Sequence, residues 1–257
     1  MSRVVLVTGA SGGIGRALCK RFLDAGDTVL ALDRNEAGVA ALAAEFGTSR
    51  LEPLVADVSD DGFVTSAIAA GVAARGPVDV AVANAGGAAG TTLAHTDAAK
   101  WRRDVDLNLN GTYYTIEAVR RSMIERRRGA IVMIGSVNGL SALGHPAYSA
   151  AKAGLVSYTK ALAIELGQYG IRANLVCPGT VKTPAWQKRV DQHPQIFEEL
   201  KKWYPLGDVA EPEDIADAVQ FLASPQARVI TGVALPVDAG LMAGNRMMAN
   251  ELTLDPL

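Results

Sequence analysis

Short apolar runs recur along the 257-residue chain, and their hydrophobic positions do not alternate with polar ones. The runs, rich in valine, isoleucine and leucine, cover residues 3–8, 28–33, 51–56, 78–84, 130–136, 171–177 and 231–237. Strands that are apolar on both faces are typical of a parallel sheet covered by helices on both sides. Between the runs, apolar residues recur at helical spacing, as from Ile14 to Leu23. This alternation predicts a doubly wound α/β sheet in one domain that spans residues 1–257.

One segment breaks this alternation. Residues 183–211 combine a helical pattern with three prolines and two tryptophans. An insertion between a strand and the next helix is where a lid over a binding site commonly lies. We therefore expect a substrate lid at about residues 183–211 of the single domain.

Composition and charge narrow the function classes. Apolar residues make up 49% of the chain, and the formal net charge of -2 indicates neither a nucleic-acid nor a membrane partner. The basic cluster at residues 120–129 is interpreted as a solvated helix end. No apolar run reaches the ~18 residues of a membrane span, and no signal peptide precedes the first run. We expect a cytoplasmic protein.

The two cysteines, Cys19 and Cys177, lie far apart in the sequence and form no disulfide framework. Neither they nor the three scattered histidines have the spacing of metal ligands, so we expect no metal site. Cys177 is interpreted as a buried core thiol.

A glycine-rich turn, TGASGGIG at Thr8–Gly15, follows the first apolar run and opens the first helix. Glycines there allow backbone N–H groups to approach a phosphate at a helix N-terminus, although a glycine cluster alone also fits a packing turn. Asp33 ends the second run, where an acid can accept hydrogen bonds from an adenosine ribose and would repel a 2′-phosphate. Gly12 supplies no basic partner for that phosphate, whereas Arg34 is placed to stack on adenine or to hold a phosphate. NAD is therefore favoured over NADP.

Two further strand ends fit the same ligand. Asp57, in ADV at residues 56–58, closes the third run and is placed to meet an adenine ring. Asn84–Gly87 closes the fourth, and its adjacent glycines allow the backbone to lie against a ligand. Ligands of open α/β sheets bind beyond the carboxyl ends of the strands, where all these turns lie.

Tyr148 and Lys152 lie four residues apart within HPAYSAAKAGL, so a helix would place both on one face. A nearby ammonium, together with a cationic nicotinamide ring, stabilises a phenolate and lowers the tyrosine pKa toward working pH. The small residues around the pair allow a cofactor to come close. Ser136 ends the fifth run, twelve residues before Tyr148, so its hydroxyl is placed to hold a substrate oxygen. The pair alone also fits an ordinary surface helix.

Taken together, these motifs resemble those of the short-chain dehydrogenase/reductase family over essentially the whole chain. The matching positions are Thr8-Gly9-x-x-x-Gly13-x-Gly15, Asn84-Ala85-Gly86, Asn108, the set Ser136, Tyr148 and Lys152, and Pro178–Thr183. Ala83 stands where asparagine is commoner in the family. The resemblance implies a Rossmann-type sheet of seven parallel strands in the order 3-2-1-4-5-6-7, and a dimer or tetramer.

The resemblance also implies residue roles. Tyr148 is the general acid/base, Lys152 binds the nicotinamide ribose and lowers the tyrosine pKa, Ser136 orients the substrate oxygen, and Asn108 maintains a chain of waters. Val181 and Thr183 hold the nicotinamide amide. The complete set of expected cofactor contacts is Gly9, Ser11, Gly13, Ile14, Gly15, Asp33, Arg34, Asp57, Val58, Asn84, Ala85, Gly86, Tyr148, Lys152, Pro178, Gly179, Val181 and Thr183.

The expected substrate contacts are Gly87, Asn138, His145 and Trp186. Asn138 and His145 are polar, which favours a polyol, a sugar or a small hydroxy acid, although His145 equally fits a structural loop residue. In the lid, Trp203 and Tyr204 are further candidates for the pocket wall, whereas the lysines after Glu198 and Glu199 fit solvated helical pairs. The predicted function is an NAD-dependent dehydrogenase. The alternatives are an NADPH-dependent ketone reductase and a non-catalytic dinucleotide-binding regulatory protein.

Two expected long helices, at residues 96–127 and 146–169, carry apolar residues on more than one face. A helix that is apolar nearly all round should be buried nearly all round, and the sheet covers only one side. The tail at residues 242–257 adds methionines and leucines. We therefore expect a homotetramer, with a dimer as the alternative.

Overall fold

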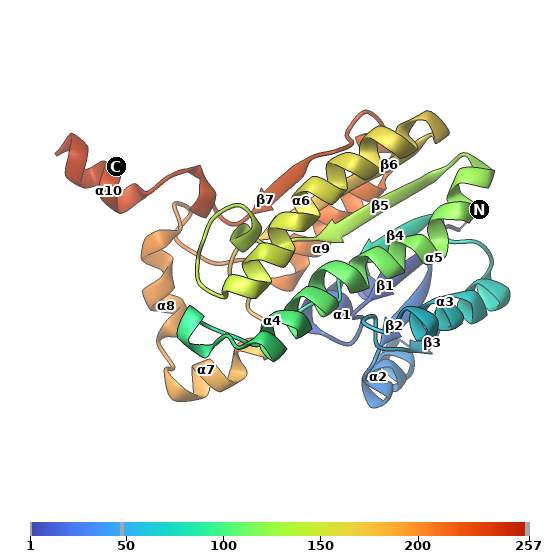
Figure 1. Ribbon diagram of the computed structural model, residues 1–257, viewed down its shortest axis with the longest axis horizontal. Helices are drawn as coiled ribbons and strands as arrows, with labels where there is room; N and C mark the ends of the chain where they lie inside the picture. Colours follow the sequence, from blue (N-terminus) through green and yellow to red (C-terminus); the bar gives the residue numbers. More distant parts are fainter. Residues whose placement is uncertain (1, 47–48, 255–257) are drawn as a thin grey trace.

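Seven parallel strands form one sheet in the order β3-β2-β1-β4-β5-β6-β7 in the computed structural model, which describes residues 2–46 and 49–254 (Figure 1). Val5 in β1 pairs with Val29 of β2 on one side and with Val80 of β4 on the other. The strands are β1 (Val4–Thr8), β2 (Thr28–Asp33), β3 (Leu51–Val55), β4 (Val80–Ala83), β5 (Gly129–Ile134), β6 (Ile171–Pro178) and β7 (Ala234–Val237). The predicted sheet and its strand order are confirmed.

Helices cover both faces of this sheet. One core joins α1 and α9 to the sheet, and the other joins α3, α5 and α6 to the opposite face; α5 and α6 cross the near face in Figure 1. The helices are α1 (Gly13–Asp24), α2 (Glu36–Phe46), α3 (Asp61–Arg75), α4 (Ala98–Val105), α5 (Gly111–Arg126), α6 (Pro146–Leu166), α7 (Gln187–Gln192), α8 (Ile196–Leu200), α9 (Pro212–Ala223) and α10 (Arg246–Thr253). No helix of the described residues is long and apolar enough to cross a membrane.

The lack of alternation in the strands follows from the two cores. Successive side chains of a strand point to opposite faces. In β1, Val5 and Val7 therefore enter the core with α1 and α9, and Leu6 enters the core with α5 and α6. All three side chains are fully buried.

Three of the expected elements have other bounds in the structure. The apolar runs at 78–84 and 231–237 are longer than β4 and β7, because burial continues past the paired residues, as at Val78. The helix expected at 96–127 begins at Ala98 and is interrupted by a π-helical segment at Asp106–Asn110, which separates α4 from α5.

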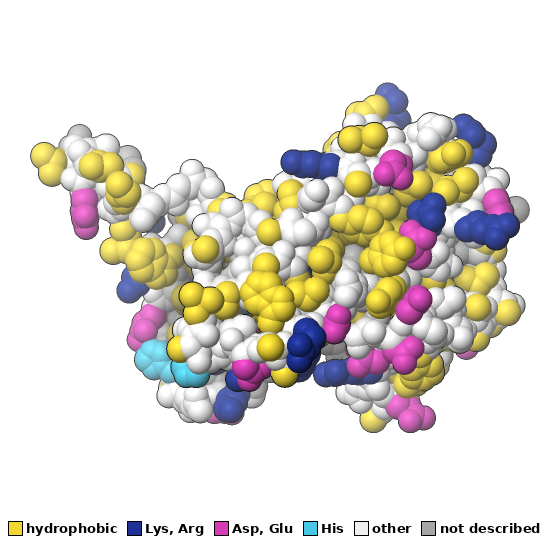
Figure 2. All heavy atoms as spheres, in the orientation of Figure 1, with side chains coloured by type: hydrophobic (Ala, Val, Ile, Leu, Met, Phe, Trp, Pro, Cys, Tyr) yellow, Lys and Arg dark blue, Asp and Glu magenta, His cyan; other side chains and the backbone are white. Residues whose placement is uncertain are grey.

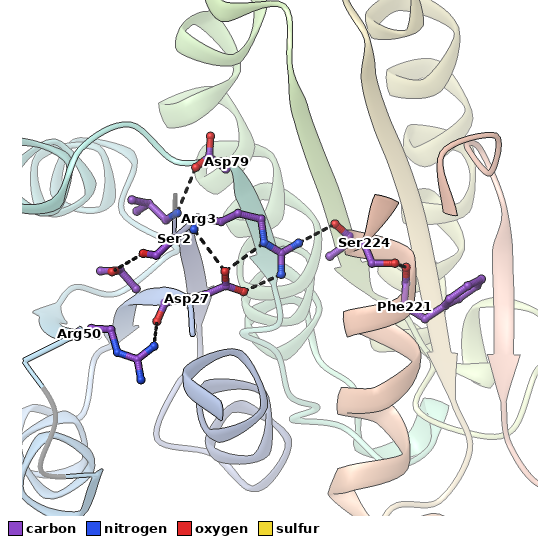
Figure 3. A network of polar contacts seen from close by, with 10 residues as sticks. Ser2, Arg3, Asp27, Arg50, Asp79, Phe221 and Ser224 are labelled. Atoms are coloured by element: carbon purple, nitrogen blue, oxygen red, sulfur yellow. Dashed lines mark hydrogen bonds and ion pairs between the residues drawn. The ribbon is translucent and has the colours of Figure 1, made fainter. Parts of the chain in front are cut away.

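A polar network ties the amino ends of the strands together (Figure 3). The Arg3 guanidinium donates to the Asp27 carboxylate, with an Nη2–Oδ2 distance of 2.6 Å, and to the Ala223 carbonyl at the end of α9. The Asp79 carboxylate accepts from the Val4 N–H and pairs with Arg126. These bonds join β1, β2, the start of β4, α5 and α9 at the edge opposite the carboxyl ends.

Short helices and an outlying tail complete the fold. Helices α7 and α8 lie within residues 183–211, on the side of the molecule toward which the arrowheads of β5 and β7 point (Figure 1). Helix α10 stands clear of the body, and Met247, Met248 and Leu252 in it are exposed.

Candidate active site

A cleft of about 410 Å³ opens at the carboxyl ends of the strands. The chain leaves β1 and β4 in opposite directions there, which is where ligands of doubly wound sheets bind. Most of the residues predicted from the sequence line the cleft: Gly9, Gly13, Ile14, Gly15, Asp33, Arg34, Asp57, Val58, Asn84, Ala85, Gly86, Gly87, Ser136, Tyr148, Lys152, Pro178, Gly179, Val181, Thr183 and Trp186. Ser11, Asn108, Asn138 and His145 are not among its lining residues.

Six other residues also line the cleft although the sequence analysis did not single them out: Leu32, Ala56, Leu107, Ile134, Gly135 and Ala185. Four of them lie at or just after a strand end. Their position next to Asp33, Asp57 and Ser136 is the signal that would have identified them.

The glycine turn can adopt its path only without side chains. Gly9 has a φ of +64°, and a Cβ there would lie 2.9 Å from the Ala85 Cα. A Cβ on Gly15 would lie 2.0 Å from the Gly9 carbonyl oxygen, and one on Gly13 would lie 2.8 Å from the Thr183 Cβ. The turn is thus packed against the β4 end and the first lid residue, and it leaves a backbone cradle at the N-terminus of α1.

Asp33 lies at the end of β2 with its carboxylate fixed by the main chain. One oxygen accepts from the Ser11 N–H and the other from the Asn35 N–H, each at 3.0 Å. Ser11 therefore orients Asp33 and does not itself face the cleft. These two bonds leave acceptor sites on the carboxylate for a hydroxyl donor.

Arg34 and Asp57 face each other across the outer end of the cleft, with 3.4 Å between Arg34 Nη1 and Asp57 Oδ2. Burial acts to raise the Asp57 pKa, but hydrogen bonds from Ser59 and the Arg34 charge lower it overall. A second hollow, of about 420 Å³, adjoins this point. It is lined by Arg34, Asp57, Ser59, Ala99, Arg102, Arg103, Asp106 and Leu107.

Asn84 holds the ends of β1 and β4 together. Its side-chain amide donates to the Thr8 and Gly9 carbonyl oxygens at 2.9 and 3.1 Å. Its own N–H donates to the Thr8 hydroxyl. The residue therefore supports the floor of the cleft between the two strands.

Ser136, Tyr148 and Lys152 meet at the opposite end of the cleft. Lys152 is buried, its ammonium donates to the Ile134 carbonyl at 2.7 Å, and its Nζ lies 5.6 Å from the centre of the Tyr148 ring. Burial lowers the pKa of Lys152 to about 8. The predicted convergence of the three side chains is therefore present, on β5 and α6.

The surroundings of Tyr148 shift its pKa. Burial raises it above its ordinary value, and hydrogen bonding with Ser136 offsets part of the rise. Lys152 does not reverse this shift, because its ammonium is directed at the Ile134 carbonyl. The expected lowering of the tyrosine pKa by the lysine together with a cationic nicotinamide ring therefore stays a prediction, and burial acts against it.

Asn108 is fully buried in the π-helical segment and binds both main-chain polar groups of Gly87. Its Oδ1 accepts from the Gly87 N–H at 3.1 Å, and its Nδ2 donates to the Gly87 carbonyl at 2.7 Å. A second Nδ2 bond reaches the Asp104 carbonyl at 2.8 Å. Both amide protons are thus used inside the protein, and the side chain holds the loop after β4.

Asn138 and His145 hold loops rather than line the cleft. Asn138 accepts from the Ser136 hydroxyl and donates to the Gly144 carbonyl and the Ser149 hydroxyl. The His145 Nδ1 lies 2.9 Å from the Gly90 carbonyl oxygen, and its N–H donates to the Thr91 carbonyl. For His145, these contacts favour the structural loop role.

The lid contributes Trp186 to the cleft. Its ring lies 4.6 Å from the Arg189 guanidinium and 5.5 Å from the Phe197 ring centre. Tyr204 is buried and donates to the Thr180 hydroxyl, so it supports the strand end, and neither Tyr204 nor Trp203 lines the pocket. Lys201 pairs with Glu198, as the helical spacing predicted.

Cys177 is a buried thiol, and burial raises its pKa to about 11.

The chain matches a protein-family model described as enoyl-(acyl carrier protein) reductase over residues 9–242. It is 45% identical to an uncharacterized oxidoreductase of Schizosaccharomyces pombe, over 97% of this chain and 95% of that one. It is 37% identical to the galactitol 2-dehydrogenase (L-tagatose-forming) of Cereibacter sphaeroides, over 91% and 92%. A short-chain dehydrogenase/reductase structure from Burkholderia thailandensis is 59% identical, with a TM-score of 0.94 over 99% of this chain and 98% of that one.

Among the similar solved structures, one contains NAD and another contains NADPH. A 3-oxoacyl-[acyl-carrier protein] reductase with bound NAD from Brucella melitensis is 36% identical, with a TM-score of 0.84 over 93% of this chain and 90% of that one. An actinorhodin polyketide ketoreductase variant with NADPH is 34% identical, with a TM-score of 0.88 over 93% and 97%.

Proposed function

Because the chain belongs to the short-chain dehydrogenase/reductase family, we propose that it transfers a hydride between a nicotinamide cofactor and a secondary alcohol or ketone. One observation carries the proposal: Ser136, Tyr148 and Lys152 meet at one end of the cleft that begins at the glycine turn. A non-catalytic dinucleotide-binding protein would need the turn but not this trio.

The cleft fits a dinucleotide. The cradle at Gly9, Gly13 and Gly15, which any Cβ would fill, suits a pyrophosphate, and Asp33 suits a ribose diol. Pro178, Gly179, Val181 and Thr183 would hold the nicotinamide end. When bound, the oxidised cofactor supplies the hydride acceptor and a positive ring charge beside Tyr148.

The chain's own residues move the proton. Ser136, held by the Asn138 side chain, orients the substrate oxygen toward the Tyr148 hydroxyl. Tyr148 accepts the proton of an alcohol or donates one to a ketone. Lys152 places its cation beside the Tyr148 ring and next to the Gly86 backbone, where ribose hydroxyls would lie. Since burial raises the Tyr148 pKa, phenolate formation depends on added positive charge.

We propose NAD as the preferred cofactor, because the fixed Asp33 carboxylate accepts from a 2′-hydroxyl and repels a 2′-phosphate. The expected kcat/KM ratio for NAD over NADP is at least about tenfold, or about 1.4 kcal/mol. Asp33→Asn should reduce that ratio, because it removes the charge and keeps the shape. Equal kcat/KM values for the two cofactors in the wild type would contradict this assignment.

The second hollow supports the alternative of an NADPH-dependent ketone reductase. Arg34, Arg102 and Arg103 line it beside Asp33's end of the cleft, and three guanidinium groups favour a phosphate. Arg102→Ala together with Arg103→Ala separates the two cofactor assignments. A selective loss of NADP turnover would favour NADPH, and no change in either kcat/KM would leave NAD preferred.

We propose a small polar substrate such as a polyol, a sugar or a hydroxy acid. The relative that oxidises galactitol supports this class, while the polar loop residues Asn138 and His145, being engaged with the backbone, support it less than expected. A panel of alcohols, polyols and sugars with NAD and NADP, followed by the absorbance of reduced nicotinamide, tests the proposal. No turnover with any secondary alcohol, and none with the matching ketones, would contradict it.

A further inference from the structure

Three side chains hold the loop that follows β4. Asn108 binds both the N–H and the carbonyl of Gly87. The His145 ring contacts the Gly90 carbonyl, and the His145 backbone N–H donates to the Thr91 carbonyl. The third is Asp104, whose two carboxylate oxygens both accept from the Ala89 N–H, at 2.9 and 3.2 Å. The loop begins at Gly86 and Gly87, which line the cleft next to Lys152.

Asp104 is unusual among these three because it is a buried carboxylate with no ion pair among the described residues. Only 1% of it is exposed, and one N–H is its single side-chain hydrogen-bond partner. Burying a charge with so few donors costs free energy, and a neutral acceptor could bind the same N–H. The position of the charge therefore requires a reason beyond holding one peptide.

The charge lies near the proton-transfer residue. Helix α4 packs on α6, and the titratable groups around Tyr148 are Asp104 from α4, Lys152 from α6, His145 just before α6, and Cys177 from β6. The negative charge of Asp104 contributes to the raised pKa of Tyr148. Asp104 thus contacts the loop beside the cleft and lies on a helix that packs against the helix of the tyrosine.

We propose that Asp104 is a positioning residue for the hydride transfer. Its buried carboxylate holds the Gly86–Thr91 loop through the Ala89 peptide, and its helix, α4, packs on α6, which carries the tyrosine that exchanges the proton. The inference rests on the proposed function.

The test compares Asp104→Ala and Asp104→Asn with the matched control Asp61→Asn. Asp61 is an exposed carboxylate at the start of α3 and lines neither hollow. Asp104→Ala should raise KM for the alcohol by about tenfold, with a smaller effect on kcat, because the loop loses its anchor. Asp104→Asn keeps one acceptor, so its KM should lie closer to that of the wild type than the KM of Asp104→Ala does. It should also move the kinetic pKa of alcohol oxidation to lower pH, because the charge is gone.

Hydrogen exchange separates failure of this inference from failure of the proposed function. The Ala89 amide should exchange faster in Asp104→Ala than in the wild type or in Asp61→Asn, whether or not a substrate is known. Loss of protection without turnover in any variant would refute only the function. Unchanged protection, or KM and pH profiles equal to those of Asp61→Asn, would overturn the role of Asp104.

Discussion

Lys152 is a buried cation that the fold holds at a cost. Its ammonium has one main-chain acceptor, the Ile134 carbonyl, and burial lowers its pKa from 10.5 to about 8. A lysine whose pKa is lower in the folded protein destabilises the fold wherever the folded state is forced to hold the charge. The penalty is present in full below about pH 8 and is lost as the pH rises from about 8 to 10.5. Burial of Lys152 therefore lowers the stability of the fold and places a cation in the site.

Replacing Lys152 by Met should abolish turnover and leave the protein at least as stable at pH 7. The lowered pKa of Lys152 corresponds to a destabilisation of about 3 kcal/mol, which the methionine variant would not have. The variant would leave the Ile134 carbonyl without its hydrogen bond, which costs about 1–3 kcal/mol. The unfolding free energy of the variant relative to the wild type should fall as the pH rises through 8–10.5, as measured in urea. Lys160→Met, at an exposed position of α6, is the control and should show no such trend. Parallel pH profiles for Lys152→Met and the wild type would contradict the lowered pKa.

Tyr148→Phe should reduce kcat by at least about a thousandfold, because it removes the hydroxyl that would exchange the proton beside Ser136. The ring keeps its contacts with Lys152 and His145, so cofactor affinity should change less than about twofold. Steady-state kinetics and cofactor titration by fluorescence measure the two quantities. Near-normal turnover would end the acid/base assignment.

At the scale of elements, the strand ends at the two edges of the sheet are stabilised differently. The carboxyl edge carries glycines and polar side chains that face a cleft, whereas the amino edge is joined by the bonds around Arg3 and Asp27 (Figure 3). Asp27 is nearly fully buried, and Arg3 spans from it to the end of α9. Stability and function thus lie at opposite edges.

Asp27→Asn should lower the unfolding free energy by about 2–3 kcal/mol, because it leaves a half-buried guanidinium without its carboxylate. Turnover at low temperature should be unchanged, because the network lies at the edge away from the cleft. Asp24→Asn breaks an exposed pair with Lys20 and should cost less than about 0.5 kcal/mol in the same urea titration. Equal effects of the two substitutions would show that the Asp27 pair contributes little.

Much of this arrangement follows from sequence pattern, and the exceptions have physical causes. Continuous apolar runs predicted the strands, because both faces of the sheet are covered. The π-helical segment at Asp106–Asn110 could not be predicted, since an apolar pattern does not distinguish one hydrogen-bond spacing from the next. Asp104 was missed because it follows Arg102 and Arg103, a run typical of a solvated turn. Its burial depends on the loop at Ala89, a contact that local periodicity does not report.

At the scale of the whole molecule, apolar side chains remain outside both cores. Figure 2 shows them gathered across the face that α5 and α6 present. Ile164 is 79% exposed there, and Trp101 and Tyr113 are also exposed. Tyr158, close to Tyr113, has a buried hydroxyl with no hydrogen-bond partner among the described residues. A second subunit on this face would cover the exposed apolar groups.

We predict a homotetramer in which α5 and α6 form one two-fold interface and the β7–α10 region forms another. Light scattering at micromolar concentration should give about four times the 26.9 kDa chain mass. Ile164→Asp should reduce the mass, whereas Phe63→Asp, at an exposed position of α3, should not. A stable and active monomer would refute the role given to both surfaces.

The π-helical segment at Asp106–Asn110 can be regarded as an insertion of one residue into a helix. A π-helical turn contains one residue more than the α-helical turn it replaces, so the run from Ala98 to Arg126 is an α-helix that carries a one-residue insertion. Deleting one residue from Asp106–Asn110 would allow regular bonds throughout. Because the wide turn absorbs the additional residue, α4 and α5 would stay nearly aligned, whereas Asn108, inside the segment, would be displaced from Gly87. The loss of a single codon inside a helix, which ordinarily disrupts a fold, would here leave a more regular helix with a misplaced site.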